Sequence, residues 1–333
     1  MATRFLAGAL LALGLTAATG AQAQTFSFGL WGDMPYHKAG DAPKIPALLH
    51  SINQSGIAFS IYDGDIKDGS SPCSDGIYAS ALAMFGQLKK PVVYVPGDNE
   101  WTDCHRKNNG GYDALERLAY LRQTMFPTAA SLGQRTMPLI HQGQPGSEFY
   151  ENVRFHHQGI VFAGLNMPGS NNNRVLDEND CTHQSARSAA QCDAANAEYL
   201  ARDAANVAWM QQAFQAAKAE KARGLVLVFQ ADPGFDLPET EGQDESQAPR
   251  YSGYRHFINR VILETEQFPG QVLLVHGDTH FFKVDKPLYS PTRLLPNLTR
   301  VQTFGSPLIH WVRVTVTPKN PNVFTVEPVI VTP

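Results

Sequence analysis

Short apolar runs alternate with stretches of helical apolar spacing over the first part of the folded chain. The runs 26–31, 57–62 and 91–95 predict buried strands, because they are apolar, rich in β-branched or aromatic residues and followed by turn residues. Between them, the segments 44–54 and 77–88 carry apolar residues every three or four positions, which predicts helices. This strand–helix–strand order favours a largely parallel sheet and an α/β fold.

Further along the chain the pattern predicts a second set of elements. We first expect a helix over 114–122, an irregular loop over 134–147 and strands over 149–157 and 159–165. A polar insertion from 169 to about 193 follows, and then an amphipathic helix over 194–222 and a strand over 224–229. The last elements of this part are a mobile surface loop over 236–250, a helix over 257–265 and a strand over 271–275. The valines of 312–316 alternate with polar residues, 319–322 is a turn and 323–331 returns, which predicts an antiparallel hairpin. Because no repeat or linker divides the chain, we expect one domain over 24–333.

The first 23 residues have the pattern of a secretory signal peptide. Arg4 gives a positive start, 5–18 is apolar, and Ala21-Gln22-Ala23 is a small-x-small cleavage signal. We therefore expect a mature chain that begins at Gln24 and is periplasmic or secreted. No later segment is long and apolar enough to predict a transmembrane span.

The net charge of the chain limits the classes of molecule that it is expected to bind. Removing the expected signal peptide takes away Arg4, which leaves 26 Lys and Arg against 31 Asp and Glu, a net charge of −5. Clustered basic residues of the kind that bind nucleic acid or anionic membranes are missing from the sequence. We therefore expect a small substrate, and the sequence leaves the oligomeric state undetermined.

The chain has four cysteines, all within the expected mature part. Export makes disulfides permissible, and four cysteines allow three pairings. We favour Cys73–Cys104, because each residue follows one of two strands expected to be neighbours, and Cys181–Cys192, because both flank the same polar stretch. The alternative is four free thiols or a zinc site, and the lack of Cys-x-x-Cys spacing counts against structural zinc.

Five short loops follow apolar runs and carry carboxylate, amide or imidazole side chains. They are 32–36 (Gly-Asp-Met-Pro-Tyr), 63–68 (Asp-Gly-Asp-Ile-Lys-Asp), 97–100 (Gly-Asp-Asn-Glu), 230–233 (Gln-Ala-Asp-Pro) and 276–280 (His-Gly-Asp-Thr-His). Ligands of open α/β sheets bind at the carboxyl ends of the strands, so we expect these loops to converge. Such a cluster is typical of a hard divalent metal that acts on phosphate.

Taken in order, these loops resemble the motifs of the calcineurin-like metallophosphoesterases. Residues 64–68 match the Gly-Asp-x-x-Asp motif completely, and the resemblance spans roughly 29–283. It implies a four-layer αββα sandwich with metals above the strand ends. It further implies that Asp33 and His280 bind a first metal and that Asp65 bridges two metals, which would activate a shared water and hold the phosphate.

Several metal ligands of the family are replaced in this chain. Pro35, Gln230 and Asp278 stand where the family has histidines, and Asp98 replaces an asparagine. Oxygen ligands suit Mg²⁺, Mn²⁺ or Ca²⁺ better than Zn²⁺, so we expect one or two divalent ions of the first kind. The candidate ligands are Asp33, Asp65, Asp98, Gln230, Asp232, Asp278 and His280.

The expected proton donor is replaced as well. Asn99 stands where the family has the histidine that protonates the leaving group, a role worth roughly 10²–10⁴-fold in rate. Asn99 and His276 are the candidate catalytic residues, with His105 as a further substitute for the donor. The sequence thus supports two hypotheses: an exported metal-dependent hydrolase of phosphate mono- or diesters, and a catalytically inactive binding protein of the cell envelope on the same fold.

Each candidate also has a plain structural explanation. Asp33 and Asp65 could cap helices, and the 97–100 loop could be turn chemistry alone. A Pro-Gly turn directly follows Asp232, and His276 could be a hydrogen-bonded histidine at the rim of the site. The ordered set of five loops favours metal binding over these explanations.

Overall fold

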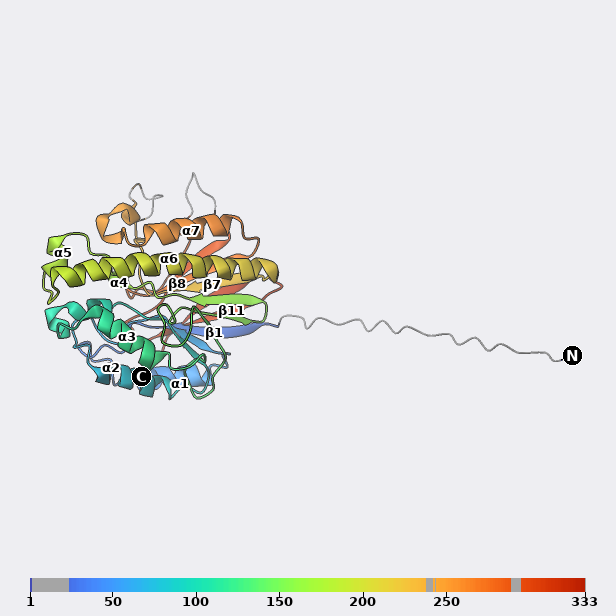
Figure 1. Cartoon of the computed structure of the whole chain (residues 1–333). Coiled ribbons are helices and arrows are strands. Elements are labelled where there is room, and N and C mark those ends of the chain that lie inside the picture. Colours follow the sequence, from blue (N-terminus) through green and yellow to red (C-terminus); the bar gives the residue numbers. More distant parts are fainter. Residues whose placement is uncertain (2–23, 238–241, 243, 289–294, 333) are drawn as a thin grey trace.

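Two β-sheets lie face to face with helices on both outer sides (Figure 1), and this confirms the predicted four-layer αββα sandwich. The computed structural model describes Met1 and residues 24–237, 242, 244–288 and 295–332. The expected signal peptide lies outside these residues except for Met1.

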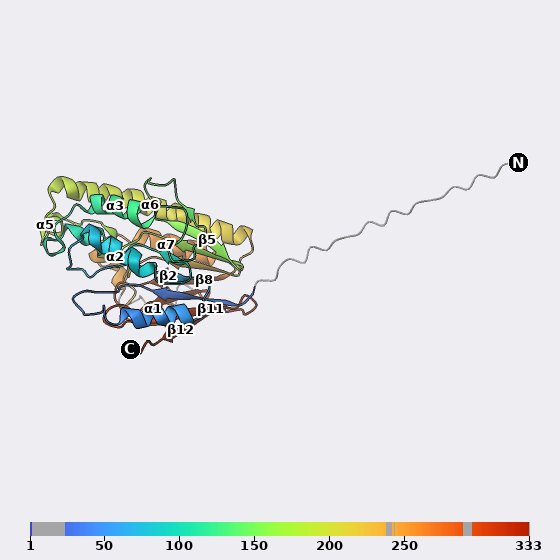
Figure 2. The ribbon, with the colours of Figure 1, turned by 90° about the horizontal axis from the view of Figure 1, so that it is seen from below.

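The first sheet has the strand order β12-β11-β1-β2-β3. Its strands are β1 (Phe26–Trp31), β2 (Ser60–Tyr62), β3 (Val92–Tyr94), β11 (Trp311–Val316) and β12 (Phe324–Val329). β1, β2 and β3 are parallel, as the strand–helix–strand order predicted. β11 and β12 form the predicted antiparallel hairpin, and β11 pairs with β1. The helices α1 (Ile45–Gln54), α2 (Asp75–Phe85) and α3 (Ala114–Met125) lie on this side of the molecule (Figures 1 and 2).

The second sheet has the strand order β4-β5-β6-β7-β8-β10-β9. Its strands are β4 (Ile140–His141), β5 (Val153–His157), β6 (Ile160–Gly164), β7 (Gly224–Val228), β8 (Gln271–His276), β9 (Lys283–Asp285) and β10 (Leu298–Gln302). β6, β7, β8 and β10 run parallel, and α6 (Ala189–Ala219) and α7 (Arg255–Glu266) cover the outer face. The sequence pattern did not predict β4, β9 and β10.

The polar insertion differs most from its prediction. It contains the short helices α4 (Gly169–Asn172) and α5 (Glu178–Thr182), and α6 begins at Ala189 instead of 194. Ser188 explains the early start, because its hydroxyl accepts from the Gln191 backbone amide in a capping box. The described part of the predicted loop 236–250 also contains two 3₁₀ turns, η4 (Glu245–Gln247) and η5 (Pro249–Tyr251).

The two sheets share an aromatic core. Phe28 of β1 and Phe59, directly before β2, meet Phe155 and Phe162 of the second sheet, with ring centroids 5.2 Å apart across these contacts. Edge-to-face pairs of this kind add to the hydrophobic stabilisation of a core. The strand ends above this core therefore project from a well-packed platform.

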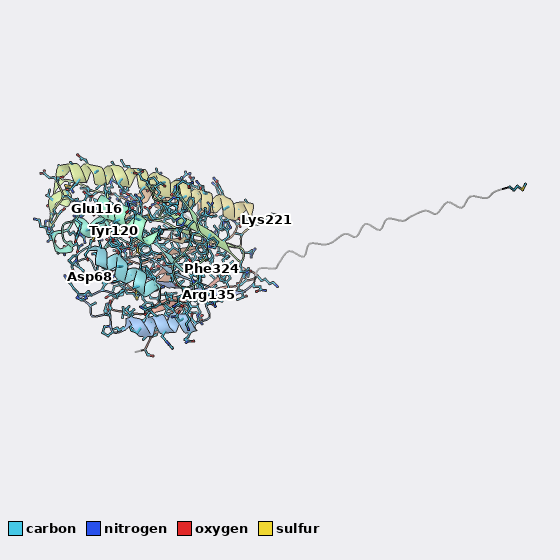
Figure 3. The ribbon with its side chains drawn as sticks, turned by 60° about the horizontal axis from the view of Figure 1, so that its bottom comes forward. Asp68, Glu116, Tyr120, Arg135, Lys221 and Phe324 are labelled. Atoms are coloured by element: carbon cyan, nitrogen blue, oxygen red, sulfur yellow. A yellow bond between two sulfur atoms is a disulfide. The ribbon has the colours of Figure 1, made fainter. Side chains whose placement is uncertain are left out.

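The strands that precede the five loops end at one end of the molecule. Asp68, the last residue of the second loop, lies at the end opposite Lys221 and Phe324, which precede or begin strands (Figure 3). Both favoured disulfides are present, Cys73–Cys104 and Cys181–Cys192. In the part of the chain that the structure describes, no helix combines the length and apolar character needed to cross a bilayer.

Candidate functional site

Backbone hydrogen bonds join the loops of the two sheets. The Asp33 amide donates to the Gly64 carbonyl at 2.8 Å within the first sheet, and the Gly277 amide donates to the Gln230 carbonyl at 3.0 Å within the second. Between the sheets, the Asp278 amide lies 3.2 and 3.3 Å from the two carboxylate oxygens of Asp33. These contacts join four of the five loops, and the Asn99 amide joins the remaining loop by donating to Asp65 Oδ1 at 3.1 Å.

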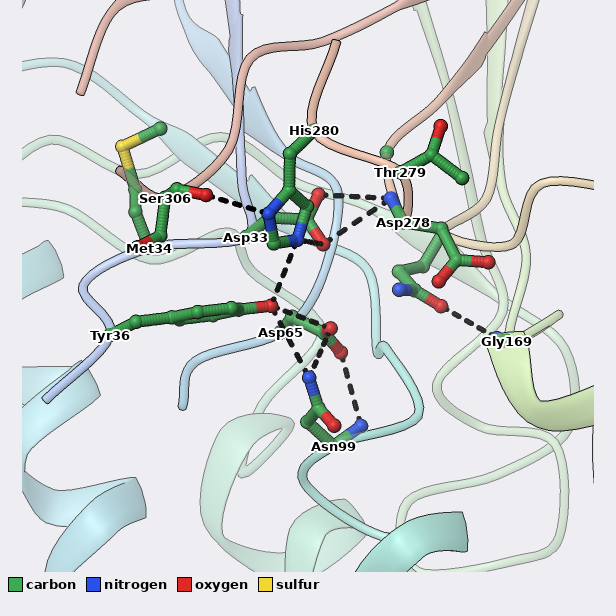
Figure 4. A network of polar contacts seen from close by, with 12 residues as sticks. Asp33, Met34, Tyr36, Asp65, Asn99, Gly169, Asp278, Thr279, His280 and Ser306 are labelled. Carbon is green, nitrogen blue, oxygen red and sulfur yellow. Dashed lines mark hydrogen bonds and ion pairs between the residues drawn. The ribbon is translucent and has the colours of Figure 1, made fainter. Parts of the chain in front are cut away.

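Tyr36 lies at the centre of the first half of the site (Figure 4). Its hydroxyl donates to Asp65 Oδ2 at 2.9 Å and lies 3.3 Å from His280 Nε2. The Asn99 amide nitrogen lies 3.2 Å from the same hydroxyl and 2.5 Å from Asp65 Oδ2. The sequence analysis did not select Tyr36; its place in the first loop, three residues after Asp33, was the available signal.

His280 is held from both sides. Its Nδ1 donates to the Ser306 carbonyl at 2.7 Å, and its Nε2 lies 3.4 Å from Asp33 Oδ1. Burial alone would lower the pKa of His280, but the hydrogen bond and charge of Asp33 outweigh it and raise the pKa to about 9. A backbone partner on one ring nitrogen leaves the other directed at the site, as in many metal-binding histidines.

Asp98 and Asp278 form the second half of the site. Asp98 Oδ2 accepts from the Ser170 hydroxyl at 2.7 Å, and its Oδ1 lies 3.4 Å from the Gln230 amide nitrogen. Gln230 in turn accepts from the Gly169 amide at 2.6 Å. A Cβ on Gly169 would stand 2.7 Å from Asp98 and 3.1 Å from Asp278, so the backbone passes closely between the two carboxylates.

Asp232 has a partly structural role. Its Oδ1 accepts from the amides of Gly234 and Phe235, which is the turn chemistry that the Pro-Gly sequence indicated. Its backbone amide donates to Asp278 Oδ2 at 2.9 Å. The second oxygen, Oδ2, is buried and has no hydrogen-bond partner, which leaves it available to a cation.

His276 lies in a different environment from the other candidates. It is fully buried, its Nδ1 contacts its neighbour's carbonyl at Gly277 and its Nε2 lies 3.2 Å from Arg300. The rings of Phe229 and Phe235 flank it. Burial, together with the nearby Arg300 charge, lowers the pKa of His276. These surroundings are those of a packed histidine, and its catalytic role stays a prediction.

Four of the candidate ligands have a left-handed backbone. Asp33, Asp65, Asp278 and His280 have φ values of 50°, 62°, 75° and 67°. Non-glycine residues adopt this conformation rarely, and such outliers concentrate at functional sites. The conformation turns these side chains back over the strand ends, and it is an independent reason to regard the cluster as a site.

The site has more negative than positive charge. Burial raises the pKa of Asp65 and of Asp278, and the nearby carboxylate of Asp98 raises both further. Asp63, which the sequence analysis had not selected, is also buried, and burial together with Asp33 raises its pKa. One oxygen of Asp63 is without a hydrogen-bond partner. Such a cluster needs protons or a bound cation to compensate its charge.

The donor set fits a hard divalent cation in its chemistry, but it is not assembled as a coordination shell. Within residues 24–237, 242, 244–288 and 295–332, no three Asp, Glu, His or Cys side chains are grouped so that they could hold a metal ion. The Tyr36 hydroxyl lies between Asp65 and His280, and the Asn99 amide nitrogen contacts both this hydroxyl and Asp65, where the resemblance would place a cation. Metal binding therefore remains a proposal, supported by the uncompensated carboxylates.

Close packing around Asp65 makes a testable prediction. A Cβ on Gly97 would stand 2.1 Å from Asp65 Oδ1 and 2.4 Å from its backbone nitrogen. We expect Gly97→Ala to lower the free energy of unfolding by about 1–3 kcal/mol, measured by urea denaturation. Gly76→Ala is the control, because the nearest atom there is 3.7 Å away and alanine favours helix α2. Equal urea midpoints for Gly97→Ala and wild type would contradict this packing.

The fold of this chain is similar to the folds of several solved structures. The chain matches a structure of PhoD with a TM-score of 0.56 and 14% identity over 93% of this chain and 70% of that chain. Purple acid phosphatase PPD1 from yellow lupin seeds matches with a TM-score of 0.49, 10% identity and coverage of 92% and 54%. GAP50, described as the anchor in the inner membrane complex of Plasmodium, matches with a TM-score of 0.46, 14% identity and coverage of 93% and 90%.

These likenesses concern the fold. The PhoD match agrees with the two-sheet αββα sandwich that the resemblance implied. The other two TM-scores lie below 0.5 and add nothing to this. No family model and no curated protein sequence matches the chain.

Proposed function

We propose that this protein is an exported, metal-dependent hydrolase of phosphate mono- or diesters. The observation that supports this most strongly is the meeting of Asp33, Asp65, Asp98 and Asp278 at the carboxyl ends of strands from both sheets. The pKa of Asp65 and of Asp278 is raised by burial and by the neighbouring Asp98 carboxylate, and such groups concentrate at functional sites. The match of 64–68 to the Gly-Asp-x-x-Asp motif of the metallophosphoesterases supports a phosphate ester as the substrate.

Asp33, Asp65, Asp98, Asp278 and His280 would hold one or two divalent cations. A bound cation would stabilise the charge of the phosphate and lower the pKa of an attacking water. Asn99 would donate its amide hydrogens to a phosphate oxygen, because an amide orients a ligand but supplies no acidic proton. Gln230 would keep Asp98 in place through the contact of its amide nitrogen.

Export is part of the proposal. The pattern of the first 23 residues indicates a signal peptide, and both disulfides are of the kind that persist in oxidising compartments. Identification of Gln24 as the first residue of the protein recovered from the periplasm or the medium would test this part.

The metal content of the purified mature protein is the first measurement. We expect elemental analysis to find a divalent ion, and we expect hydrolysis of an aryl phosphate or an aryl diester after addition of Mg²⁺, Mn²⁺ or Ca²⁺, with less after Zn²⁺. A chelator should abolish that turnover. A protein that binds no metal and hydrolyses neither ester under any of these conditions would overturn the proposal and favour the inactive envelope-binding alternative.

A further inference from the structure

A cleft of about 660 Å³ continues outward from the carboxylate site. Asp232 and Asp278 line one end, and the insertion that contains α4 and α5 lines much of the rest. Four arginines also line this cleft: Arg106, Arg174, Arg187 and Arg250. Four guanidinium groups therefore line the cleft next to the acidic centre.

Two of the four arginines already have a carboxylate partner. Arg106 lies 2.5 Å from Asp103, and Arg250 pairs with Glu245. Arg106 also donates to the hydroxyl of Ser170, which contacts Asp98 at 2.7 Å. The Ser170 side chain thus connects Asp98 of the acidic centre to Arg106 of the cleft.

Arg174 and Arg187 have no carboxylate partner of this kind. Arg174 donates to the Ser252 carbonyl at 3.3 Å and lies 5.7 Å from the ring centroid of Tyr199. Arg187 donates to the carbonyls of Cys181 and Asp180 at 3.2 and 2.9 Å. Both side chains are half-buried, and neither forms an ion pair with any residue that the structure describes. A partly desolvated cation without an anion is costly, which favours an anionic ligand here.

The acidic residues of the cleft beside these arginines are occupied elsewhere. Asp177 accepts from the backbone amide of Asp180 at 2.9 Å, and Asp180 accepts from that of Leu176 at 2.9 Å. Both contacts lie at the start of α5 and satisfy main-chain donors. The disulfide Cys181–Cys192 joins this segment to α6, so the position of Arg187 is covalently supported.

We propose that Arg174 and Arg187 bind a second anionic group of the substrate, a phosphate or a carboxylate on the leaving-group side of the ester. A phosphate held at the acidic centre would extend its leaving group into this cleft, toward the two guanidinium groups that have no carboxylate partner. The assignment to a substrate rests on the proposed function, whereas the anion site itself does not require turnover.

Binding of three related probes tests the anion site directly. Glycerol 3-phosphate has one anionic group, 3-phosphoglycerate adds a carboxylate, and glycerol 1,3-bisphosphate adds a phosphate. By isothermal titration, in chelator and again with Ca²⁺, we expect one of the two doubly anionic probes to bind roughly 10- to 100-fold more tightly than glycerol 3-phosphate, the range for hydrogen bonds to charged groups. The tighter of the two identifies the second anion.

Substitution of the two arginines should remove this preference. In the double variant Arg174→Gln/Arg187→Gln we expect the three probes to bind with similar affinity, while Arg135→Gln keeps the wild-type ratio. Arg135 is exposed, lies on the side of the molecule away from Asp68 (Figure 3) and loses one positive charge, as each arginine of the double variant does. The single variant Arg174→Gln, checked by thermal melting, covers the case in which loss of the Arg187 contacts prevents folding.

Two results would overturn the inference. One is a wild-type protein that binds none of the probes or binds all three equally, and the other is a folded arginine variant that keeps the wild-type ratio. Failure of the proposed function is seen separately, as lack of hydrolysis of every probe with metal present. An intact binding preference without hydrolysis would retain the anion site in a binding protein.

Discussion

Replacing Asp65 with asparagine is expected to lower phosphoester hydrolysis by at least about a hundredfold, because metal-assisted charge stabilisation is worth several kcal/mol and each tenfold in rate corresponds to about 1.4 kcal/mol. Asp65 lies between the two halves of the site, where burial and Asp98 raise its pKa. The resemblance assigns it the bridging position between two metals. An amide at this position is a weaker ligand and carries no charge.

The fold should survive this substitution. Asn99 donates its backbone amide to Asp65 Oδ1 at 3.1 Å, and an asparagine oxygen can accept the same bond. The side-chain nitrogen of the introduced asparagine would then face the Tyr36 hydroxyl, which can accept a hydrogen bond instead of donating one. Rotation of the Asn99 amide would present its oxygen in place of its nitrogen. We therefore expect a cooperative thermal transition for Asp65→Asn.

The measurement is kcat for an aryl phosphate at saturating metal, together with the metal content of the variant. Asp193→Asn is the matched control, because it makes the same change on the exposed surface of α6. We expect wild-type turnover in the control and a reduced metal content in Asp65→Asn. Unchanged turnover in folded Asp65→Asn would falsify the mechanism.

The stability of the metal-free protein is expected to fall as the pH rises from 6 to 9. The pKa of Asp65 and of Asp278 is raised by burial and by neighbouring carboxylates, and the pKa of His280 is raised to about 9 by Asp33 despite its burial. In each case the folded state binds protons more tightly than the unfolded chain does. The stabilisation is therefore present at low pH and is lost as the pH rises, between about 6.5 and about 9 for His280.

The size of the effect follows from the number of protons held in excess. Each extra proton in the folded state makes the free energy of unfolding fall by about 1.4 kcal/mol per pH unit. Thermal melting in chelator at several pH values measures this slope. A divalent cation that binds only the folded state should offset this loss of stability. It should raise the free energy of unfolding by about 2.7 kcal/mol at a concentration one hundred times its Kd.

Asp278→Asn tests the electrostatic origin of the effect. Its Oδ2 accepts from the Asp232 amide, a bond that an asparagine oxygen can keep, while one charge of the cluster is lost. We expect this variant to melt at a higher temperature than wild type in chelator at pH 8 and to gain less from added metal. The Asp193→Asn control should follow the wild-type curve. A melting temperature independent of pH from 6 to 9 would contradict the charge argument.

Local patterns predicted most of the first sheet. The strands β1, β2 and β3 follow from short apolar runs, and the β11–β12 hairpin follows from alternation around a turn. The second sheet was predicted less completely. β4 has two residues and β9 has three, which is too short for any periodicity to show. β10 pairs with β8, and this pairing depends on contacts between residues that are distant in the sequence.

The inner arrangement of the site could be predicted only in part. The sequence analysis selected Asp33, Asp65, Asp98, Asp278 and His280, and these are joined in the structure by the loop contacts described above. It did not select Tyr36 or Ser170, whose hydroxyls contact Asp65 and Asp98. Neither residue belongs to a motif that predicts a ligand, and each reaches the site because a loop folds over the strand ends.

The sequence by itself determined which side chains are available and where they stand along the chain, since each of the five loops follows an apolar segment whose spacing predicts a strand. It also favoured the two disulfide pairs over the other pairings, and the structure confirms them. Only the tertiary structure decided that Tyr36 lies between Asp65 and His280, that His276 packs against Arg300, and that two arginines of the cleft contact backbone carbonyls instead of carboxylates. The physical reason is that strand periodicity is a local property, whereas the direction of a loop side chain depends on contacts made across two packed sheets.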